Sequence, residues 1–509
     1  MIPRADLAVV GDDDLTMDLF PGFPISNLQI RSPIQVMLRK PDFQRETNHW
    51  TAVQVSTFIA SFLDNELIPS LILWNSTTHI FVIDGGHRLS ALRAWMEDDY
   101  GDGSISRKFY DGELSEEQKK IARRTRALIE KTIGRYSDLK AIIDNNSEAD
   151  ELSTRRARNL FKRALSLQWV QGSASVAESS FFKINNQGTP LDDTEEMLLR
   201  NRRKPISIAA RSILRAGTGH KYWSYFSKEK QARVEELARE LYDFLFQPEA
   251  DQPIKTLELP LGGSVSPVDA LSLLIDTLIS LDKTNETRTI AGYDDDKEGF
   301  ETIRVLENAM QVLRRITGNG AGSLGLHPAV YFYNEKGKHS RFLFLGTLQL
   351  IAERLKNNDA AFFQKFTKGR RKLEHFLIEH KPTIGLLLQN MSRRTRVTNM
   401  RDLIYFLVNE FAAGRDVSVE DAIKRIGARG SVLQISASAA GVNFSDDTKS
   451  AIFMNLALRK ALECAICGGL LNTAKSISYD HKVRVRDGGR GSVDNVQLAH
   501  PFCNDGVKN

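Results

Sequence analysis

The 509-residue sequence predicts a multidomain α+β protein with three parts. The first ~200 residues alternate short apolar strands with helical patterns, and residues 201–435 carry apolar side chains mainly at helical spacing. All three cysteines lie after residue 463, at metal-ligand spacing. We therefore expect domains at residues 1–200, 201–435 and 446–509, with the small-residue segment 436–441 ahead of the last one.

The composition is that of an ordinary globular protein, with 41% hydrophobic and 26% charged residues. The net charge of +5 is small for this length, so a nucleic-acid surface would have to be a local patch. No apolar run reaches the ~20 residues that a spanning helix needs, and acidic residues 12–14 stand where a signal peptide would need an apolar core. We expect a cytoplasmic protein with no membrane association.

Four potential metal ligands form two pairs near the C-terminus. Cys464 and Cys467 bracket two residues, as do His500 and Cys503. Three thiolates and one imidazole at this spacing can close a tetrahedral, structural Zn²⁺ site. The segment has few large apolar residues of its own, so zinc would stabilise what its core cannot. The alternative is three buried free thiols.

Residues between the two ligand pairs can carry out chemistry. The segment 476–479 alternates like a short strand and ends at Asp480 and His481. The glycines of 487–491 predict a loop, and Pro501 predicts the start of a short helix. A strand, a loop, a second strand and a helix are therefore expected around the metal.

This segment resembles the HNH, or ββα-metal, endonuclease family. The resemblance rests on Cys464-x-x-Cys467, Asp480-His481, Gly488-Gly489, Asp494-Asn495 and His500-x-x-Cys503-Asn504. It implies that His481 takes a proton from water, a role that suits histidine because it changes protonation near neutral pH. It also implies that Asn495 orients the His481 ring.

The resemblance further implies a catalytic Mg²⁺ or Mn²⁺ held by Asp480 and Asn504, both of which offer hard oxygen ligands. Four cations surround this site and are expected to contact DNA phosphates: Lys482, Arg484, Arg486 and Arg490. The family usually has cysteine where His500 stands. His500 is expected to bind zinc, and the alternative is that it points into the catalytic site.

A second constellation lies near the N-terminus. Residues 34–38, 71–74 and 79–83 are expected to form strands, and the last runs into Asp84-Gly85-Gly86-His87-Arg88 before a helix. Glycines at such a turn let backbone N–H groups approach an anion, which Arg88 could pair bidentately. A purely structural turn is the alternative.

Three ordered blocks resemble the N-terminal domain family of GmrSD-type restriction proteins, which shares the ParB/sulfiredoxin-like fold. The blocks are the opening motifs 41–45 with Trp50 and 65–69, the turn 84–88, and 181–191 with its Ile184-Asn185 pair. The resemblance implies an α+β domain that binds, and often hydrolyses, a nucleoside triphosphate. The implied pocket residues are Gln44, Arg45, Asp84, Gly85, Gly86, His87, Arg88 and Asn185.

A charged segment at 115–166 separates the second and third blocks. Its basic runs, 118–126 and 155–163, have a helical pattern. They are expected to be either solvated helices or a surface that tracks DNA phosphates without reading sequence. Farther along, residues 232–245, 268–281, 302–316, 342–355 and 448–463 are expected to be helices.

The two resemblances together imply a metal-dependent DNA endonuclease of a prokaryotic defence system, whose N-terminal domain senses a nucleotide or modified DNA. The substrate would be phage or foreign DNA, and other proteins of a defence operon are expected partners. One HNH site should nick DNA, and a homodimer could cut both strands. Two alternatives remain: a nucleotide-dependent DNA-binding regulator with a non-catalytic zinc knuckle, and a homing or mobile-element nuclease.

Overall fold

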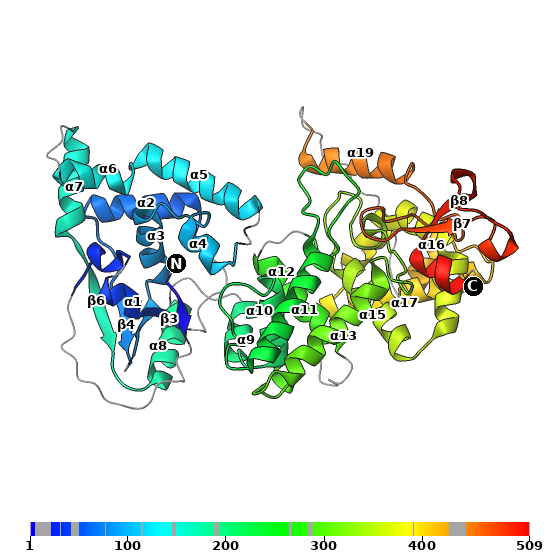
Figure 1. Cartoon of the computed structure of the whole chain (residues 1–509), viewed down its shortest axis with the longest axis horizontal. Coiled ribbons are helices and arrows are strands. Elements are labelled where there is room, and N and C mark those ends of the chain that lie inside the picture. The colour runs from blue at the N-terminus through cyan, green and yellow to red at the C-terminus, as the bar shows by residue number, and fades with distance from the viewer. Residues whose placement is uncertain are drawn as a thin grey trace. The chain divides into compact units, whose positions relative to one another are not determined.

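A computed structural model describes most of the chain (Figure 1). The described residues are 2–5, 22–30, 32–41, 50–76, 78–112, 114, 116–144, 149–187, 193–263, 267–282, 289–389, 391–426 and 444–507. They divide into two compact units. Unit 1 comprises Met1–Arg202 with Thr218–Tyr222, and unit 2 comprises Arg203–Gly217 with Trp223–Asn509. The expected domain boundaries at 200/201 and 435/446 stay predictions.

Unit 1 is built on a six-stranded mixed sheet in the order β1-β3-β5-β4-β6-β2. β3 runs parallel to both β1 and β5, and β4 runs parallel to β6. β4 pairs antiparallel with β5, as does β2 with β6. The strands are β1 (Arg4–Ala5), β2 (Gly22–Pro24), β3 (Leu38–Pro41), β4 (Leu71–Asn75), β5 (Ile80–Asp84) and β6 (Ala164–Val170).

Helices cover both faces of this sheet. Side chains alternate along β5, so that Ile80 and Val82 join one apolar cluster while Phe81 and Ile83 join another. This double burial explains why β4 and β5 have nearly continuous apolar sequences. The helices are η2 (Ile25–Leu28), α1 (Pro33–Met37), α2 (Ala52–Leu63), α3 (Gly86–Met96), α4 (Ser104–Phe109), α5 (Glu116–Thr132), α6 (Tyr136–Asp144), α7 (Glu151–Lys162), α8 (Ala174–Gln187) and α9 (Asp193–Arg200).

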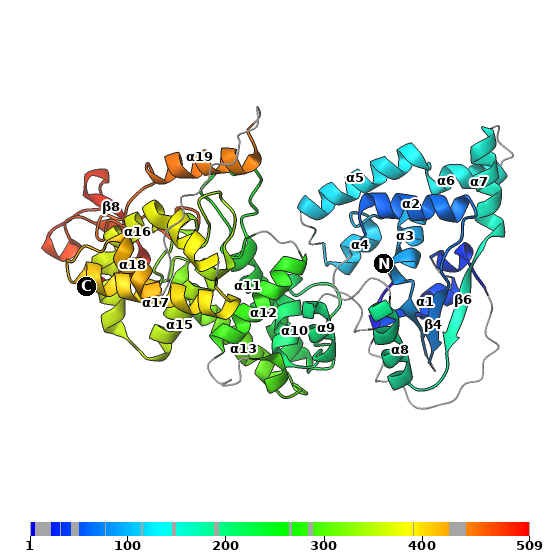
Figure 2. The ribbon, with the colours of Figure 1, turned by 180° about the vertical axis from the view of Figure 1, so that it is seen from behind.

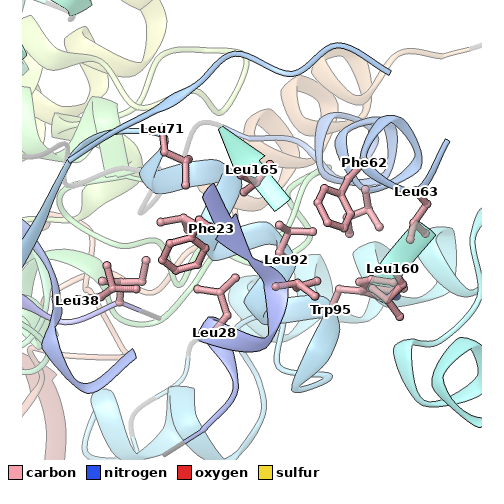
Figure 3. Close-up of a cluster of buried hydrophobic side chains, with 14 of the residues drawn as sticks. Phe23, Leu28, Leu38, Phe62, Leu63, Leu71, Leu92, Trp95, Leu160 and Leu165 are labelled. Carbon is pink, nitrogen blue, oxygen red and sulfur yellow. The ribbon is translucent and has the colours of Figure 1, made fainter. Parts of the chain in front are cut away.

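The larger cluster forms the main core of unit 1 (Figure 3). It joins Phe62 of α2, Leu92 and Trp95 of α3, and Leu160 of α7 to the sheet residues Leu71 and Leu165. The smaller cluster packs Ala177 and Phe181 of α8 against Trp74 and Phe81 on the opposite face. The charged segment 115–166 therefore contributes part of the main core. Its described residues include three helices, α5 to α7, where helices were expected at two basic runs.

One expected strand is a helix. Residues 34–38 are mostly apolar and short enough for a strand, yet Pro33–Met37 forms α1 and the strand β3 begins at Leu38. The physical reason is the start signal: Pro33 occupies the first turn, where its fixed φ and missing N–H are tolerated. The strands predicted at 71–74 and 79–83 are confirmed as β4 and β5.

Unit 2 begins as a bundle of helices, which confirms the mainly helical middle region. No described helix is long and apolar enough to cross a membrane. The helices are α10 (Pro205–Leu214), α11 (Lys228–Phe246), α12 (Pro267–Leu281), η3 (Ile290–Gly292), α13 (Phe300–Ile316), α14 (Pro328–Tyr331), α15 (Arg341–Lys356), α16 (Ala360–Gln389), α17 (Arg393–Ala412) and α18 (Val419–Ile426).

The C-terminal module follows α19 (Asp446–Leu458), which ends before the expected residue 463. Its strands β7 (Ser478–His481) and β8 (Val496–Ala499) form an antiparallel pair, shown in red beside α16 in Figures 1 and 2. The short helical turns are η4 (Val485–Asp487), η5 (Val493–Asn495) and the π-helical turn η6 (Cys503–Val507). The expected order of strand, loop, strand and helix is present.

Candidate metal centre and nuclease site

The four predicted zinc ligands converge. One ligand atom from each of Cys464, Cys467, His500 and Cys503 lies within 4.8 Å of all the others. A tight turn brings the first two together, since the Cys464 N–H donates to Gly469 O at 2.8 Å and the Gly468 N–H to Cys464 O at 2.9 Å. The second pair lies at the end of β8 and the start of η6.

The His500 ring presents Nδ1 to the sulfurs. Nδ1 lies 3.4 Å from Cys467 Sγ and 3.8 Å from Cys503 Sγ. A tetrahedral Zn²⁺ with bonds of about 2.3 Å to sulfur and 2.0 Å to nitrogen requires S···N separations of about 3.5 Å. Nε2 lies 3.0 Å from the carbonyl oxygen of Leu470, to which it donates when Nδ1 binds a metal. The group fits a metal such as zinc, with His500 inside it rather than in the catalytic site.

The four potential ligands are close enough to shift one another's pKa values. A hydrogen bond from Cys467, followed by one from Cys503, lowers the pKa of the Cys464 thiol. The hydrogen bond with Cys464 is the main cause that raises the pKa of Cys467 to about 11. Burial lowers the pKa of His500, which keeps its imidazole neutral. A metal bound by these groups would replace the protons of the thiols.

The predicted catalytic residues Asp480 and His481 end strand β7. Asp480 is 6% exposed, and its Oδ2 accepts a 2.7 Å hydrogen bond from Gln497, its partner across the strand pair. His481 lies opposite Val496 and is half-buried. The Gln497 hydrogen bond thus orients the buried carboxylate, and the neighbouring imidazole is partly exposed.

Asn504 approaches the same strand from η6. Its Nδ2 donates to Ser478 Oγ at 2.8 Å. Ser478 and Asp480 are two residues apart on β7, so their side chains lie on the same face of the strand. The structure therefore brings Asn504 to the side of β7 that carries Asp480. Mg²⁺ and Mn²⁺ prefer oxygen ligands of these two kinds, and a catalytic ion held by Asp480 and Asn504 stays a prediction.

The Asn495 side chain fixes the loop between the strands. Its Oδ1 accepts from the Val483 N–H at 2.8 Å, and its Nδ2 donates to the carbonyl oxygens of Val483 at 3.1 Å and Arg490 at 2.8 Å. These three bonds close the loop 483–490 onto the start of β8. The contact of Asn495 with His481 stays a prediction. The hydrogen bonds of the Asn495 amide indicate that this side chain stabilises the loop.

Gly489 is needed for the same loop. A Cβ at this position would lie 1.8 Å from Val483 O and 2.9 Å from Asn495 Nδ2. We predict that Gly489→Ala displaces the loop and lowers DNA cleavage about 10²-fold, the scale of a misplacement near 1 Å. Gly491→Ala is the matched control, because a Cβ there meets nothing within 4 Å. Equal plasmid-cleavage rates for the two variants would contradict the prediction, and zinc content should be unchanged in both.

The predicted DNA-contacting cations lie on or beside this loop. Lys482 Nζ donates to Asp494 O at 2.9 Å, while Arg486 and Arg490 are exposed and Arg484 is half-buried. Apolar side chains are also exposed around them, including Val485 at 68% and Val493 at 88%. The loop therefore offers a mixed basic and apolar surface next to Asp480 and His481. Contact with DNA phosphates stays a prediction for these cations.

The turn from β5 into α3 contains five of the predicted nucleotide-binding residues. Gly85 adopts a left-handed conformation at φ 92°, and a Cβ there would lie 2.3 Å from a Leu71 methyl carbon. Arg88 is 9% exposed and pairs with Asp84 at 2.6 Å. It also donates to the carbonyl oxygens of Pro69 and Ser70. The Arg88 guanidinium therefore links the turn by hydrogen bonds to Pro69 and Ser70, which precede β4.

His87 and the segment after β3 complete the described part of this region. The His87 ring stacks on Trp50 with centroids 5.8 Å apart. Because β3 and β5 are parallel and paired, their carboxyl ends, at Pro41 and Asp84, lie at the same end of the sheet. Gln44, Arg45 and the Asn185 side chain lie outside the described residues. The nucleotide pocket, including Gly86, stays a prediction.

The basic helices of unit 1 are partly neutralised. Arg126 of α5 pairs with Asp98 at 2.8 Å and Asp102 at 2.7 Å, and Arg156 of α7 pairs with Asp64 at 2.7 Å. Other cations, such as Arg123 and Arg124, are exposed. Both interpretations of these helices, solvated faces and a phosphate-tracking surface, remain open.

The sequence patterns did not reveal the hydrogen-bond partners of the site residues. Gln497 and Ser478 depend on strand register and helix placement, which the motif spacing does not give. Leu470 acts through its backbone, so its side chain carried no signal. Glu374, whose Oε2 accepts the Leu470 N–H at 2.6 Å, lies almost one hundred residues away in sequence.

Comparison with known families identifies two segments. Residues 464–509 match the HNH endonuclease family, which places the metal cluster and β7 in a DNA-cleaving class. Residues 25–203 match the GmrSD restriction endonuclease, N-terminal domain. Both resemblances drawn from the motifs are thus confirmed, and together they support a nuclease in a restriction or defence context with DNA as its substrate. No curated protein and no solved structure matches the chain.

Proposed function

We propose that the protein is a metal-dependent DNA endonuclease of a prokaryotic defence system that nicks phage or foreign DNA. The observation that carries this proposal is the placement of Asp480 and Asn504 on one side of β7, with His481 next in the strand. The two family matches give the context. The chain would act in the cytoplasm, alone or with proteins of the same operon.

The chemistry follows from the residues at the strand end. Asp480 and Asn504 would hold a divalent ion such as Mg²⁺ or Mn²⁺, which when bound supplies positive charge at the leaving oxygen. His481 accepts the proton of the attacking water through its imidazole. Gln497 holds the Asp480 carboxylate in place through the 2.7 Å hydrogen bond. Arg486 and Arg490 would contact the phosphates on either side.

The number of catalytic sites in the assembly determines whether one or both DNA strands are cut. One hydrolytic centre acts on one phosphodiester bond at a time, so a monomer nicks and a homodimer could break both strands. We further propose that residues 1–200 form a ParB-like domain that binds a nucleoside triphosphate or modified DNA and controls when the C-terminal site cuts. The sheet edge shared by β3 and β5 supports this placement of the pocket.

An Asp480→Asn variant separates this proposal from a regulator with a non-catalytic zinc knuckle. Asparagine keeps the size of Asp480 and can still accept from Gln497, but it removes the charge that binds the divalent ion. We expect phage restriction in cells to fall on the order of 10²–10³-fold, the scale of one lost preorganised electrostatic contact. Asp494→Asn, at an exposed position of the same loop, should restrict normally. Full restriction by the Asp480 variant would support the regulator.

A further inference from the structure

A buried ion pair lies on α16, far in sequence from the metal ligands. Arg370 Nε donates to Glu374 Oε1 at 2.6 Å, and both side chains are 1% exposed. The other guanidinium nitrogens donate to the carbonyl oxygens of Leu324 at 2.5 Å and Gly325 at 3.0 Å. Tyr331 O–H donates to Glu374 Oε1 at 3.0 Å. A buried ion pair is stable only when its remaining donors and acceptors are hydrogen-bonded. Here those hydrogen bonds are made with residues outside α16.

The second carboxylate oxygen of Glu374 is linked to the metal cluster by hydrogen bonds through Leu470. Oε2 accepts the Leu470 N–H at 2.6 Å. The carbonyl oxygen of the same residue lies 3.0 Å from His500 Nε2. Two hydrogen bonds through one peptide residue therefore connect the carboxylate of Glu374 to the ring whose Nδ1 faces the sulfurs.

Arg370 contacts a second segment that packs against the same ring. It binds the carbonyl oxygen of Gly325. The backbone of Gly325 packs so closely that a Cβ would lie 2.9 Å from His500 Cδ2 and 2.8 Å from Ser476 Oγ. A Cβ on Gly469, in the turn between the ligand pairs, would lie 2.5 Å from Arg370 Nε. The pair thus contacts both the ligand turn and the segment that packs on the imidazole.

We infer that Arg370 and Glu374 are positioning residues for the metal cluster. They fix the orientation and the tautomer of the His500 ring. The metal site is then shared between the C-terminal module and the helical part of unit 2. Outer residues of this kind orient a ligating imidazole and raise its basicity, and their loss typically lowers metal affinity 10–100-fold. The inference rests on metal binding by the cluster and is independent of DNA cleavage.

The test is the rate at which the full-length, zinc-loaded protein releases Zn²⁺ to a chromophoric chelator. Glu374→Gln keeps the size of the side chain and removes the charge that compensates Arg370. We expect release about 10–100-fold faster than from the unmodified protein. Glu379→Gln on the same helix is the matched control, because Glu379 is 76% exposed, and it should release zinc at the unmodified rate.

A milder variant and a spectroscopic readout separate positioning from general destabilisation. Tyr331→Phe removes only the hydrogen bond to Glu374 Oε1, so it serves where the glutamine variant does not fold. The Co²⁺-substituted variants should show shifted visible bands, because those bands report ligand geometry. Release rates and Co²⁺ spectra that match those of the Glu379 variant would overturn the inference. Neither measurement involves DNA, so a failure of the proposed nuclease activity would leave this result interpretable.

Discussion

A His481→Ala variant is expected to lose about 10²–10⁴-fold in the rate of DNA cleavage, the usual contribution of a general base. The side chain ends β7 and is half-buried, so its removal leaves the strand pair with β8 intact. DNA binding and zinc content should therefore be unchanged. Cleavage is measured on supercoiled plasmid and binding by gel shift.

The matched control for this variant is His375→Ala, which removes an exposed imidazole from α16. It should cleave at the unmodified rate. If the His481 variant also cleaves at that rate, His481 is not the base and the assignment drawn from the HNH motif is incorrect.

A Cys467→Ser variant is expected to fall from about one bound zinc per chain to a small fraction, because serine is a far weaker zinc ligand than a thiolate. The cluster around Cys464, Leu471, Ala499 and Cys503 is small, so the module depends on the metal for much of its stability. Structural zinc contributes on the order of 10 kcal/mol in small peptides. Solubility and cleavage should fall together with zinc content.

Ala465→Ser provides the control for this loss, since it adds the same hydroxyl at an exposed position between the two ligands. Zinc content is measured by elemental analysis, and the thermal transition by circular dichroism. Full zinc occupancy in the Cys467 variant would show that the four residues do not form the metal site.

The sequence predicted those parts of the molecule that depend on short-range spacing. The ligand pairs bracket two residues each, a spacing that a single turn can close, and the structure brings all four ligand atoms together. The strands β4 and β5 were predictable because burial on both faces makes their sequences continuously apolar. The turn after β5 was marked by its glycines.

Other parts depend on contacts that the sequence does not display. The short apolar run at 34–38 suggested a strand, while Pro33 starts a helix there. Arg370 and Glu374 are four residues apart on a helix, a spacing typical of exposed ion pairs, and only the tertiary structure shows that both are buried. The bonds of the Asn495 amide to the loop 483–490 likewise follow from the turn geometry and not from the motif.

The most direct test of the nuclease assignment is cleavage of supercoiled plasmid by the full-length protein with Mg²⁺ or Mn²⁺, with and without each nucleoside triphosphate. We predict that nicked circles appear before linear product, that a chelator of the divalent ion stops the reaction, and that at least one nucleotide changes its rate. Intact supercoiled plasmid under every condition, with one zinc bound per chain, would contradict the assignment and leave a DNA-binding regulator.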